Sequence, residues 1–400
     1  MHMDIRDLIA KRSALLYYLL RKSPVTRSDL VEVMEVSQPT ITQWLKDLLA
    51  ADLVREVGIS TRSSNMGRPR ILIELNPEAA WAGAFHITSR TAEVGLVNWI
   101  GQVVESATIS WEAMEMSYSR ALLEILVNKL AQWLKERNIP DSRMLGLGVA
   151  TAGPVDNQQG EVITYNLEDG VRRRHSFPVR DILTALTPWP IRMDTNAWAI
   201  ASGERWFGSK YENFMVIHAH EGVAAGTVLN GQLYRGSGLA GELFSVNVII
   251  HNPASPLCGR KMQLSDIVRR KAVLARIPSE KGLRDLDQVV IAANQGDTEV
   301  LQVLMDCAEA LVIVCSPLVN TLDLDAVVLS GPIFEVPAVV AYIRRYIQEQ
   351  SFAGVMENRP PQVTPISFQR QAGLVGAASL VFNSVFQANT NQREYWAINL

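Results

Sequence analysis

The chain has 400 residues, of which 48% are hydrophobic and 20% are charged. This composition supports a large buried core divided into two or three domains, and it excludes a disordered or fibrous protein. The three cysteines, Cys258, Cys307 and Cys315, are too few for a disulfide framework, and the sequence has neither an apolar leader nor a twenty-residue apolar run. We therefore expect a cytoplasmic protein without a membrane partner.

The net charge of −3 is unevenly distributed. Residues 1–70 contain 11 Lys and Arg against 8 Asp and Glu, so the rest of the chain carries an excess of six negative charges. Only the N-terminal part suits a polyanion, and its excess is modest. That balance favours specific sites on DNA over strong non-specific binding.

The chain begins with segment 5–21, whose apolar residues broadly follow helical spacing and predict one helix. Residues 25–53 predict two further helices joined by a tight turn. Thr26 offers a hydroxyl cap to the first of these, which has an acid in its first turn. Ser37 caps the second, and Pro39 comes early in it, where a missing N–H does no harm. This pattern is typical of a helix-turn-helix with the preceding helix packed behind it.

The second helix of the pair is expected to bury one face and expose another. Its apolar residues recur at helical spacing, at Ile41, Leu45, Leu48 and Leu49. The remaining side chains are polar and suit hydrogen bonds to base edges and phosphates. We expect DNA contacts from Ser37, Gln38, Thr40, Thr42, Gln43 and Lys46. The alternative is a helical hairpin with a polar face.

Two short strands, 53–58 and 70–75, flank a polar loop after the helix-turn-helix. Strands and loop together predict a wing. Its Arg62 and Arg68 are expected to contact phosphate or an adjacent minor groove. The alternative is a hairpin tip that only faces solvent.

The rest of the chain alternates strand and helix patterns, which argues for layered α/β lobes. Expected strands are 82–87, 92–97, 144–150, 214–220, 222–229 and 326–332, and expected helices are 122–137, 297–320 and 373–382. Asn230-Gly231 is a hairpin signal, and 236–242 is a glycine-rich loop.

An N-terminal helix-turn-helix, the run Gly67-Arg68-Pro69-Arg70 and a repeating α/β body together resemble the repressor branch of the ROK family (repressors, open reading frames, kinases). The resemblance covers about 5–382. It implies a winged helix-turn-helix over 1–75, then two actin/hexokinase-like (ribonuclease H-like) α/β lobes. The first lobe would span 76–195 and be completed by a C-terminal helix around 373–388. The second, 196–372, would serve effector binding and oligomerisation, with an effector cleft between the lobes.

Three departures from the family's kinases argue against catalysis. The phosphate loop corresponds to 86–90, which lacks the metal-binding Asp and the glycines, and His86 is more simply a strand or core histidine. Asn196 takes the place of the catalytic Asp, and an amide cannot act as that base, although a shifted register would place Asp194 there. Of the family's four zinc ligands only Cys258 remains. We therefore expect no metal and no cofactor, with segment 252–263 either held by packing or mobile.

The same resemblance implies a polar set for an effector. Its members are Asn166, Asn196, Glu242 and Ser245, the last in the place of a zinc-linked histidine. Glu242 is the strongest member, because a carboxylate can accept hydrogen bonds from two neighbouring sugar hydroxyls. Alternatively, Glu242 caps a helix or faces solvent, and Asn166 has a turn role.

These features predict a DNA-binding transcriptional regulator, a repressor of carbohydrate-metabolism genes, and not an enzyme. We expect a homodimer or homotetramer that binds a pseudo-palindromic operator in double-stranded DNA and senses a sugar or phosphosugar. One alternative is an ATP-dependent sugar kinase with a DNA-binding head. Another is a regulator controlled by a protein partner.

Overall fold

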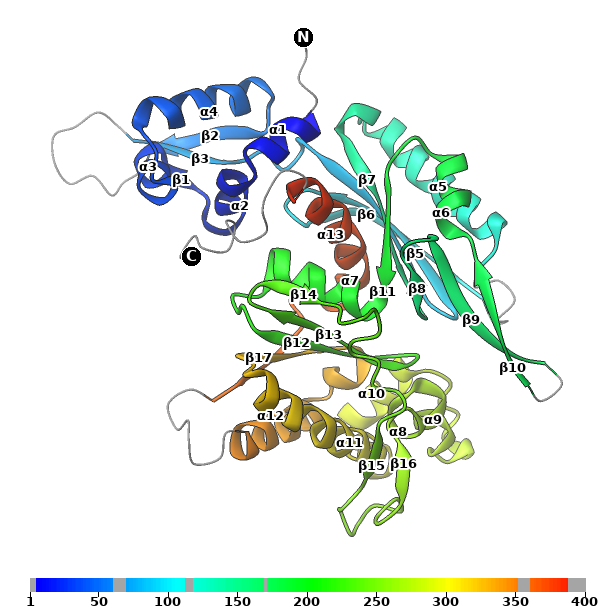
Figure 1. The fold of residues 1–400 in the computed structure, drawn as a ribbon. Helices are drawn as coiled ribbons and strands as arrows, with labels where there is room; N and C mark the ends of the chain where they lie inside the picture. Colours follow the sequence, from blue (N-terminus) through cyan, green and yellow to red (C-terminus); the bar gives the residue numbers. More distant parts are fainter. Residues whose placement is uncertain (1–4, 60–69, 112–117, 169–170, 352–359, 388–400) are drawn as a thin grey trace. The chain divides into compact units, whose positions relative to one another are not determined.

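The computed structural model describes residues 5–59, 70–111, 118–168, 171–351 and 360–387, and only the backbone of 165–168 and 171–173. It divides into two compact units (Figure 1). Unit 1 comprises the residues up to 194 and those from 377, and unit 2 comprises 195–376. The expected DNA-binding domain and the expected first lobe thus lie in one unit. The expected division into domains 1–75, 76–195 and 196–372 stays a prediction.

The head of unit 1 is a winged helix. Its elements are α1 (Ile5–Lys11), α2 (Ser13–Lys22), β1 (Val25–Thr26), α3 (Arg27–Met34), α4 (Gln38–Ala50), β2 (Val54–Ile59) and β3 (Ile71–Leu75). The strands form an antiparallel sheet in the order β1-β3-β2. The predicted helix pair and the two wing strands are confirmed.

Local hydrogen bonds explain where these helices begin. Thr26 Oγ1 accepts from the backbone N of Asp29 at 3.3 Å, and Asp29 Oδ2 accepts from the backbone N of Thr26 at 2.8 Å. Two donors that a helix start leaves unpaired are thereby satisfied. Ser37 Oγ does the same for Thr40 N at 3.4 Å, which confirms both predicted caps.

The single helix predicted over 5–21 is wrong. The chain breaks at Arg12, whose φ of −117° lies outside the helical region. Ser13 Oγ donates to Ala10 O at 2.9 Å at this junction. Both short helices bury an apolar face, so the helical spacing of apolar residues continues across the break. The spacing alone therefore did not reveal the break.

The lobe of unit 1 contains a five-stranded sheet in the order β11-β7-β4-β5-β6. Its elements are β4 (Trp81–Ile87), β5 (Thr91–Asn98), β6 (Val103–Ser110), α5 (Arg120–Glu136), the 3₁₀ turn η2 (Asp141–Arg143), β7 (Met144–Thr151), α6 (Val179–Leu186) and β11 (Ile191–Thr195). A second sheet joins β8 (Val155–Asp156), β9 (Glu161–Glu168) and β10 (Val171–Phe177). The predicted strands and the long helix of this region are confirmed.

Strand β7 shows why the last helix, α13 (Ala372–Phe386), belongs against this lobe. Leu147 and Val149 enter the apolar core. Gly148 points to the other face, where a Cβ atom would lie 1.8 Å from Ala377 O. Only glycine permits this approach, so the alternation of β7 packs side chains on one face and helix backbone on the other.

Unit 2 is built on a five-stranded sheet in the order β14-β13-β12-β17-β18. Its strands are β12 (Phe214–Ala219), β13 (Val223–Leu229), β14 (Gln232–Tyr234), β17 (Ala326–Ser330) and β18 (Gln362–Pro365), with a separate pair β15 (Asn247–Ile249) and β16 (Lys261–Gln263). Its helices are α7 (Asn196–Gly203), α8 (Ser265–Val268), α9 (Arg270–Ala275), α10 (Leu286–Asn294), α11 (Thr298–Leu322) and α12 (Pro337–Gln350), with one π turn, η3 (Glu204–Gly208), and three 3₁₀ turns, η4 (Ser279–Lys281), η5 (Pro332–Glu335) and η6 (Gln369–Gln371).

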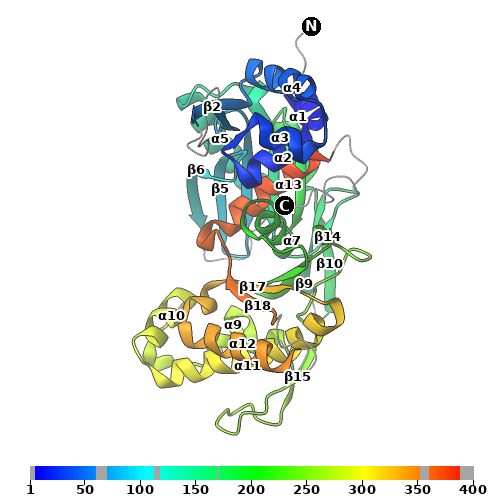
Figure 2. The same ribbon diagram turned by 90° about the vertical axis from the view of Figure 1, so that its left-hand side faces the viewer.

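Two cores lie on opposite faces of this sheet. Along β12, Met215 and Ile217 join the core that α11 and α12 cover, whereas Phe214 and Val216 join the core shared with α7. Figures 1 and 2 show α11 and α12 side by side. At Asn230-Gly231 both φ angles are positive, 51° and 67°, which confirms the predicted tight hairpin.

Helix α11 is long and apolar enough to cross a membrane by length and composition, and it is the one such helix in the described residues. However, 72% of its most apolar stretch is buried inside the protein. Cys307 and Cys315 lie on it and are buried, as predicted for core residues.

Candidate DNA-binding and effector sites

Helix α4 presents the predicted polar face to solvent. Ser37, Gln38, Thr42, Gln43 and Lys46 are exposed, whereas Ile41, Leu45 and Leu48 are fully buried. Thr40 is half-buried, and its hydroxyl lies 2.8 Å from that of Ser37 at the helix start. The face thus offers exposed amides, hydroxyls and one ammonium group, which are the donors and acceptors used at base edges and phosphates.

Two of these side chains have partners within the helix. Thr42 Oγ1 donates to Gln38 O at 2.9 Å, and Gln43 Nε2 donates to Asp47 Oδ1 at 2.8 Å. Such exposed pairs are worth only about 0.2–0.5 kcal/mol. Gln43 can therefore exchange Asp47 for a base edge at small cost.

Arg12, at the junction of α1 and α2, also contacts α4 and was missed from the sequence. Its guanidinium carbon lies 4.6 Å from the ring centroid of Trp44, and Nη2 lies 3.9 Å from Asp47 Oδ2. A cation stacked on an aromatic ring is stabilising. Arg12 thus links the junction of α1 and α2 to α4. No local pattern in the sequence signals this contact, because it joins residues more than thirty positions apart.

The wing strands are described, but Arg62 and Arg68 lie outside the described residues. Their predicted DNA contacts stay predictions. At the base of the wing, Arg55 Nη2 and Glu74 Oε1 are 2.7 Å apart across β2 and β3. Arg27 on α3 pairs with Glu56 on β2 at 3.1 Å.

Arg143, in η2 at the start of β7, joins the head to the lobe. Its Nη1 donates to Ala51 O at 3.2 Å and to Ala79 O at 2.9 Å. Ala51 is the C-cap of α4, so a residue of the lobe is hydrogen-bonded to the end of α4. Arg6 of α1 adds a second link, because its Nη2 donates to Met144 O at 2.9 Å.

The turn after β4, the predicted counterpart of the kinase phosphate loop, is closed by its own side chain. Thr88 Oγ1 accepts from Thr91 N at 2.9 Å and from Arg90 N at 3.2 Å. These are backbone amides that could otherwise face an anion. His86 is a buried strand residue as predicted, with Nδ1 2.7 Å from Glu93 Oε2 on β5.

Asn196 is the first residue of α7 and is 8% exposed. Within the described part of the chain, its Oδ1 is buried without a hydrogen-bond partner. A buried amide oxygen that lacks a donor is costly, so this atom is suited to accept from a ligand hydroxyl. Asp194, the alternative position, is 1% exposed on β11 and belongs to unit 1.

The loop that leads to Glu242 is held between α7 and β13 of unit 2. Trp198 Nε1 of α7 donates to Ala240 O at 2.9 Å, and Ala225 N of β13 donates to Gly241 O at 2.8 Å. A Cβ atom at Gly241 would lie 1.9 Å from Ala225 O, so only glycine lets the loop approach β13 this closely. Burial raises the pKa of the half-buried Glu242 above its ordinary value. A carboxylate so placed gains from ligand hydroxyls that donate to it.

The other two predicted effector residues differ from this pair. Ser245 is exposed, in the turn where Val246 N donates to Leu243 O. Asn166 lies on β9 of unit 1, where its backbone pairs with Arg173, and its predicted contact stays a prediction. Segment 252–263 is held by packing, because its Leu257 is buried in the core and its last strand, β16, pairs with β15.

Cys258 is exposed, and its Sγ lies 3.6 Å from His251 O. In the described residues, no group of three or more His, Cys, Asp or Glu is arranged to hold a metal ion.

Residues 90–384 match the ROK family, well over half of the chain. The chain belongs to the ROK family. Residues 10–56 of this ROK protein match the bacterial regulatory protein arsR family, a span that includes α2, α3 and α4. The two matches confirm the recognised family and the helix-turn-helix that precedes the body.

Among named relatives, this ROK protein is similar to the xylose repressor of Bacillus subtilis (strain 168). They are 22% identical over 398 residues, which cover 95% of this chain and 98% of the repressor. Among solved structures, it is similar to a ROK family transcriptional regulator described as a homologue of the E. coli MLC protein. That pair has a TM-score of 0.70, 18% identity, and coverage of 96% and 98%.

A ROK family glucokinase from Streptomyces griseus, solved with glucose and AMPPNP, has a TM-score of 0.58 and 20% identity. It covers 76% of this chain and 100% of its own. Regulators thus match nearly the whole chain and the kinase about three quarters of it. The predicted fold, a winged helix-turn-helix before a hexokinase-like α/β body, is confirmed.

Proposed function

We propose that this ROK protein is a DNA-binding transcriptional repressor of carbohydrate-metabolism genes that responds to a sugar or phosphosugar. The observation that carries the proposal is the exposed polar face of α4 on a head joined to a ROK body. Relatives named as xylose repressors, similar over nearly their whole length, support it. As a DNA-binding protein it would act in the cytoplasm.

The proposed reading face consists of Gln38, Thr42, Gln43 and Lys46 on α4, with Ser37 and Thr40 at its start. Two copies of the head on half-sites about one helical turn apart would bind a pseudo-palindromic operator. This arrangement requires at least a homodimer. The small positive excess of residues 1–70 agrees with a complex in which base contacts add to weak phosphate attraction.

The proposed effector contacts centre on Glu242 and Asn196. Their chain neighbours Gly241 and Ala197 pack on Ala225 and Gly226 of β13, and both residues carry acceptor oxygens that gain from ligand hydroxyls. Asn166 and Ser245 complete the proposed set. A sugar changes operator affinity only if it binds one arrangement of the protein more tightly than another. Arg143, which holds the end of α4 from the lobe, is a physical route for that coupling.

We further infer that the body is not a sugar kinase, although ROK kinases share its fold. The proposal rests on Asn196 in the register of the catalytic base and on the Thr88 hydroxyl that caps the amides of the phosphate turn. Turnover of ATP with any sugar, lost in Asp194→Asn, would favour the kinase alternative.

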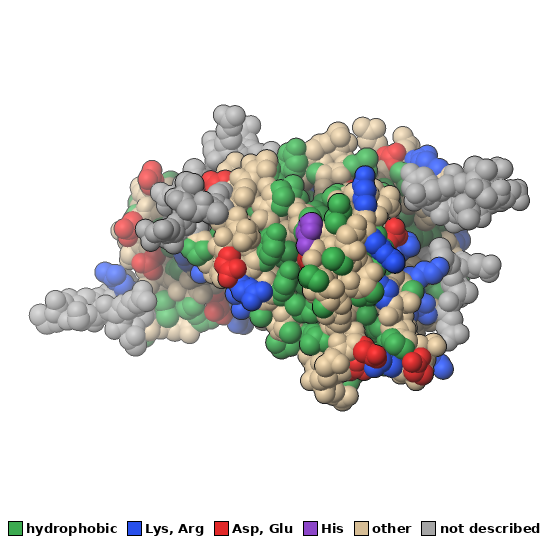
Figure 3. Space-filling view, turned by 90° about the horizontal axis from the view of Figure 1, so that it is seen from below, with side chains coloured by type: hydrophobic (Ala, Val, Ile, Leu, Met, Phe, Trp, Pro, Cys, Tyr) green, Lys and Arg blue, Asp and Glu red, His purple; other side chains and the backbone are tan. Residues whose placement is uncertain are grey.

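A protein partner in place of a sugar is the second candidate. Leu239 is 64% exposed, and Phe244 and Ile249 are each 42% exposed, all near Glu242 in the sequence. Exposed apolar groups of this kind are typical of docking surfaces. Apolar side chains also gather in a band on the face that Figure 3 shows.

Thermal shift against a panel of sugars and phosphosugars, with ATP and Mg²⁺ added separately, tests the sensor proposal. A ligand at a hundredfold over its Kd stabilises the folded state by about 2.7 kcal/mol. We expect at least one sugar to raise the Tm and ATP to have no effect, with the sugar effect lost in Glu242→Gln. An increase in Tm with ATP would contradict the proposal. If no compound changes the Tm, control by a protein partner would be favoured.

A further inference from the structure

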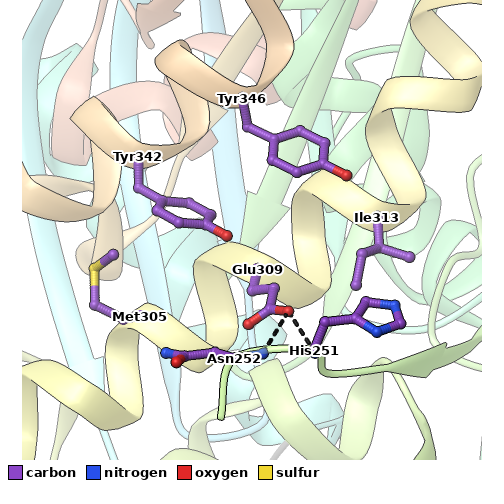
Figure 4. Close-up of a pocket in the computed structure, with 7 residues that line it drawn as sticks. All are labelled: His251, Asn252, Met305, Glu309, Ile313, Tyr342 and Tyr346. Atoms are coloured by element: carbon purple, nitrogen blue, oxygen red, sulfur yellow. Dashed lines mark hydrogen bonds between the residues drawn. The ribbon is translucent and has the colours of Figure 1, made fainter. Parts of the chain in front are cut away.

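A pocket lies in unit 2, and its lining includes none of the residues proposed for sugar or DNA contacts. Its volume is about 360 Å³, within the ordinary range of small-molecule sites. Its lining comes from α11, α12 and the segment that follows β15 (Figure 4). All of these elements belong to unit 2, so the pocket is complete within it.

Glu309 of α11 supplies the charge of this pocket. It is 7% exposed, and its Oε1 accepts from the backbone N of His251 at 2.6 Å and of Asn252 at 3.2 Å. Both hydrogen bonds described for this carboxylate go to Oε1, which leaves Oε2 to accept from a ligand. Figure 4 shows the carboxylate between these backbone donors and the tyrosines of α12. A buried carboxylate is stabilised by a positive charge, and the described lining contains no Lys or Arg.

Two tyrosines form the opposite wall. The rings of Tyr342 and Tyr346 are stacked, with centroids 6.4 Å apart and planes at 25°. Aromatic faces attract cations, and Tyr342 already has the guanidinium carbon of the exposed Arg345 at 5.8 Å from its centroid. Met305 and Ile313 add apolar surface.

We propose that this pocket binds a small organic ammonium ion, a protonated amine on a compact apolar body. The ammonium group would donate to Glu309 Oε2 and face the tyrosine rings, and the apolar body would contact Met305 and Ile313. An anion is excluded by the Glu309 charge. A sugar is disfavoured because the apolar surface would leave several of its hydroxyls without partners. The site adds a ligand class to the proposed function and does not depend on it.

Isothermal titration of the full-length protein with two shape-matched pairs of a charged and a neutral probe tests this inference. The pairs are phenethylamine with 2-phenylethanol, and isopentylamine with 3-methyl-1-butanol. Each pair keeps the shape and removes the positive charge. We expect at least one cation to bind tenfold or more tightly than its neutral partner. Equal affinities within both pairs, or binding of neither cation at millimolar concentration, would overturn the proposal.

Variants locate the site. Glu309→Gln keeps an oxygen for the two backbone donors and removes the charge, so we expect a loss of tenfold or more in cation affinity. Glu349→Gln removes the same charge from an exposed position on α12 and should change nothing. Because Glu309→Gln could disturb folding, Met305→Trp provides a second test that fills the pocket and leaves the carboxylate in place. Unchanged cation binding in Met305→Trp, or sugar binding that Glu309→Gln abolishes, would overturn the proposal.

Discussion

Replacing Gln43 by alanine tests whether α4 reads DNA bases. Gln43 is exposed, and its one side-chain partner is Asp47 on the same helix. Losing that pair costs about 0.2–0.5 kcal/mol, and alanine is a better helix former, so the fold should be unaffected. A lost bidentate base contact costs about 1–3 kcal/mol, a fall of roughly 5- to 150-fold in preference for operator over unrelated DNA. The effect on recognition should therefore exceed the effect on stability several-fold.

The assay is fluorescence anisotropy at one fixed salt concentration, with an operator selected from random duplexes and an unrelated duplex of equal length. Gln132→Ala is a matched control, because Gln132 Nε2 donates to Glu136 Oε1 at 2.7 Å in the same i, i+4 arrangement on the exposed face of α5. The control should keep full discrimination. An equal loss of affinity for both duplexes in Gln43→Ala would remove Gln43 from base recognition and refute the reasoning.

Three further predictions concern the body. Burial raises the pKa of Glu242, so unfolding releases a proton between pH 4.5 and the raised pKa, and the stability of the wild type falls as pH rises through that window. Glu242→Gln should therefore have a higher Tm than the wild type at pH 7 but not below pH 4.5. Equal Tm values at pH 7 would contradict this prediction. Arg143→Met should lower the free energy of unfolding, measured by urea denaturation, by about 1–3 kcal/mol, and it should weaken the effect of sugar on operator affinity. The control Arg137→Met breaks the exposed ion pair with Glu105 and should lower the free energy of unfolding by less than about 1 kcal/mol. Cys258 is exposed, whereas burial raises the pKa of Cys315 to about 12. Ellman's reagent at pH 8 should therefore label one thiol rapidly in the native protein and three thiols in guanidinium. Rapid labelling of three thiols in the native protein would be inconsistent with buried cysteines on α11.

Elements that depend on short-range patterns were predictable from the sequence. The caps at Thr26 and Ser37 and the hairpin at Asn230-Gly231 each depend on side chains or glycine within a few residues. Strand and helix periods placed β4, β5, α5 and α11 for the same reason. The resemblance to the ROK family then supplied the fold of the body, which periodicity alone does not specify.

Contacts between distant residues were not predictable. Arg143 reaches Ala51 across 92 positions of sequence, and Glu309 reaches His251 across 58. Neither pair leaves a local pattern, because an isolated Arg on a loop or Glu on a helix is normally solvated. The break at Arg12 was missed for another reason, since two short helices that bury one face keep the periodicity of one long helix. The pocket around Glu309 could be found only once α11 and α12 were placed together.

Operator binding measured with and without sugars is the sharpest test of a repressor that a sugar releases from DNA. Anisotropy titrations with the selected operator should be run at fixed salt against a sugar and phosphosugar panel that begins with xylose, with ADP production followed when ATP and Mg²⁺ are present. The account predicts that one sugar weakens operator binding about tenfold or more, that Glu242→Gln abolishes this effect, and that no ADP forms. Operator affinity unchanged by every sugar, or sugar-dependent ADP production, would contradict it.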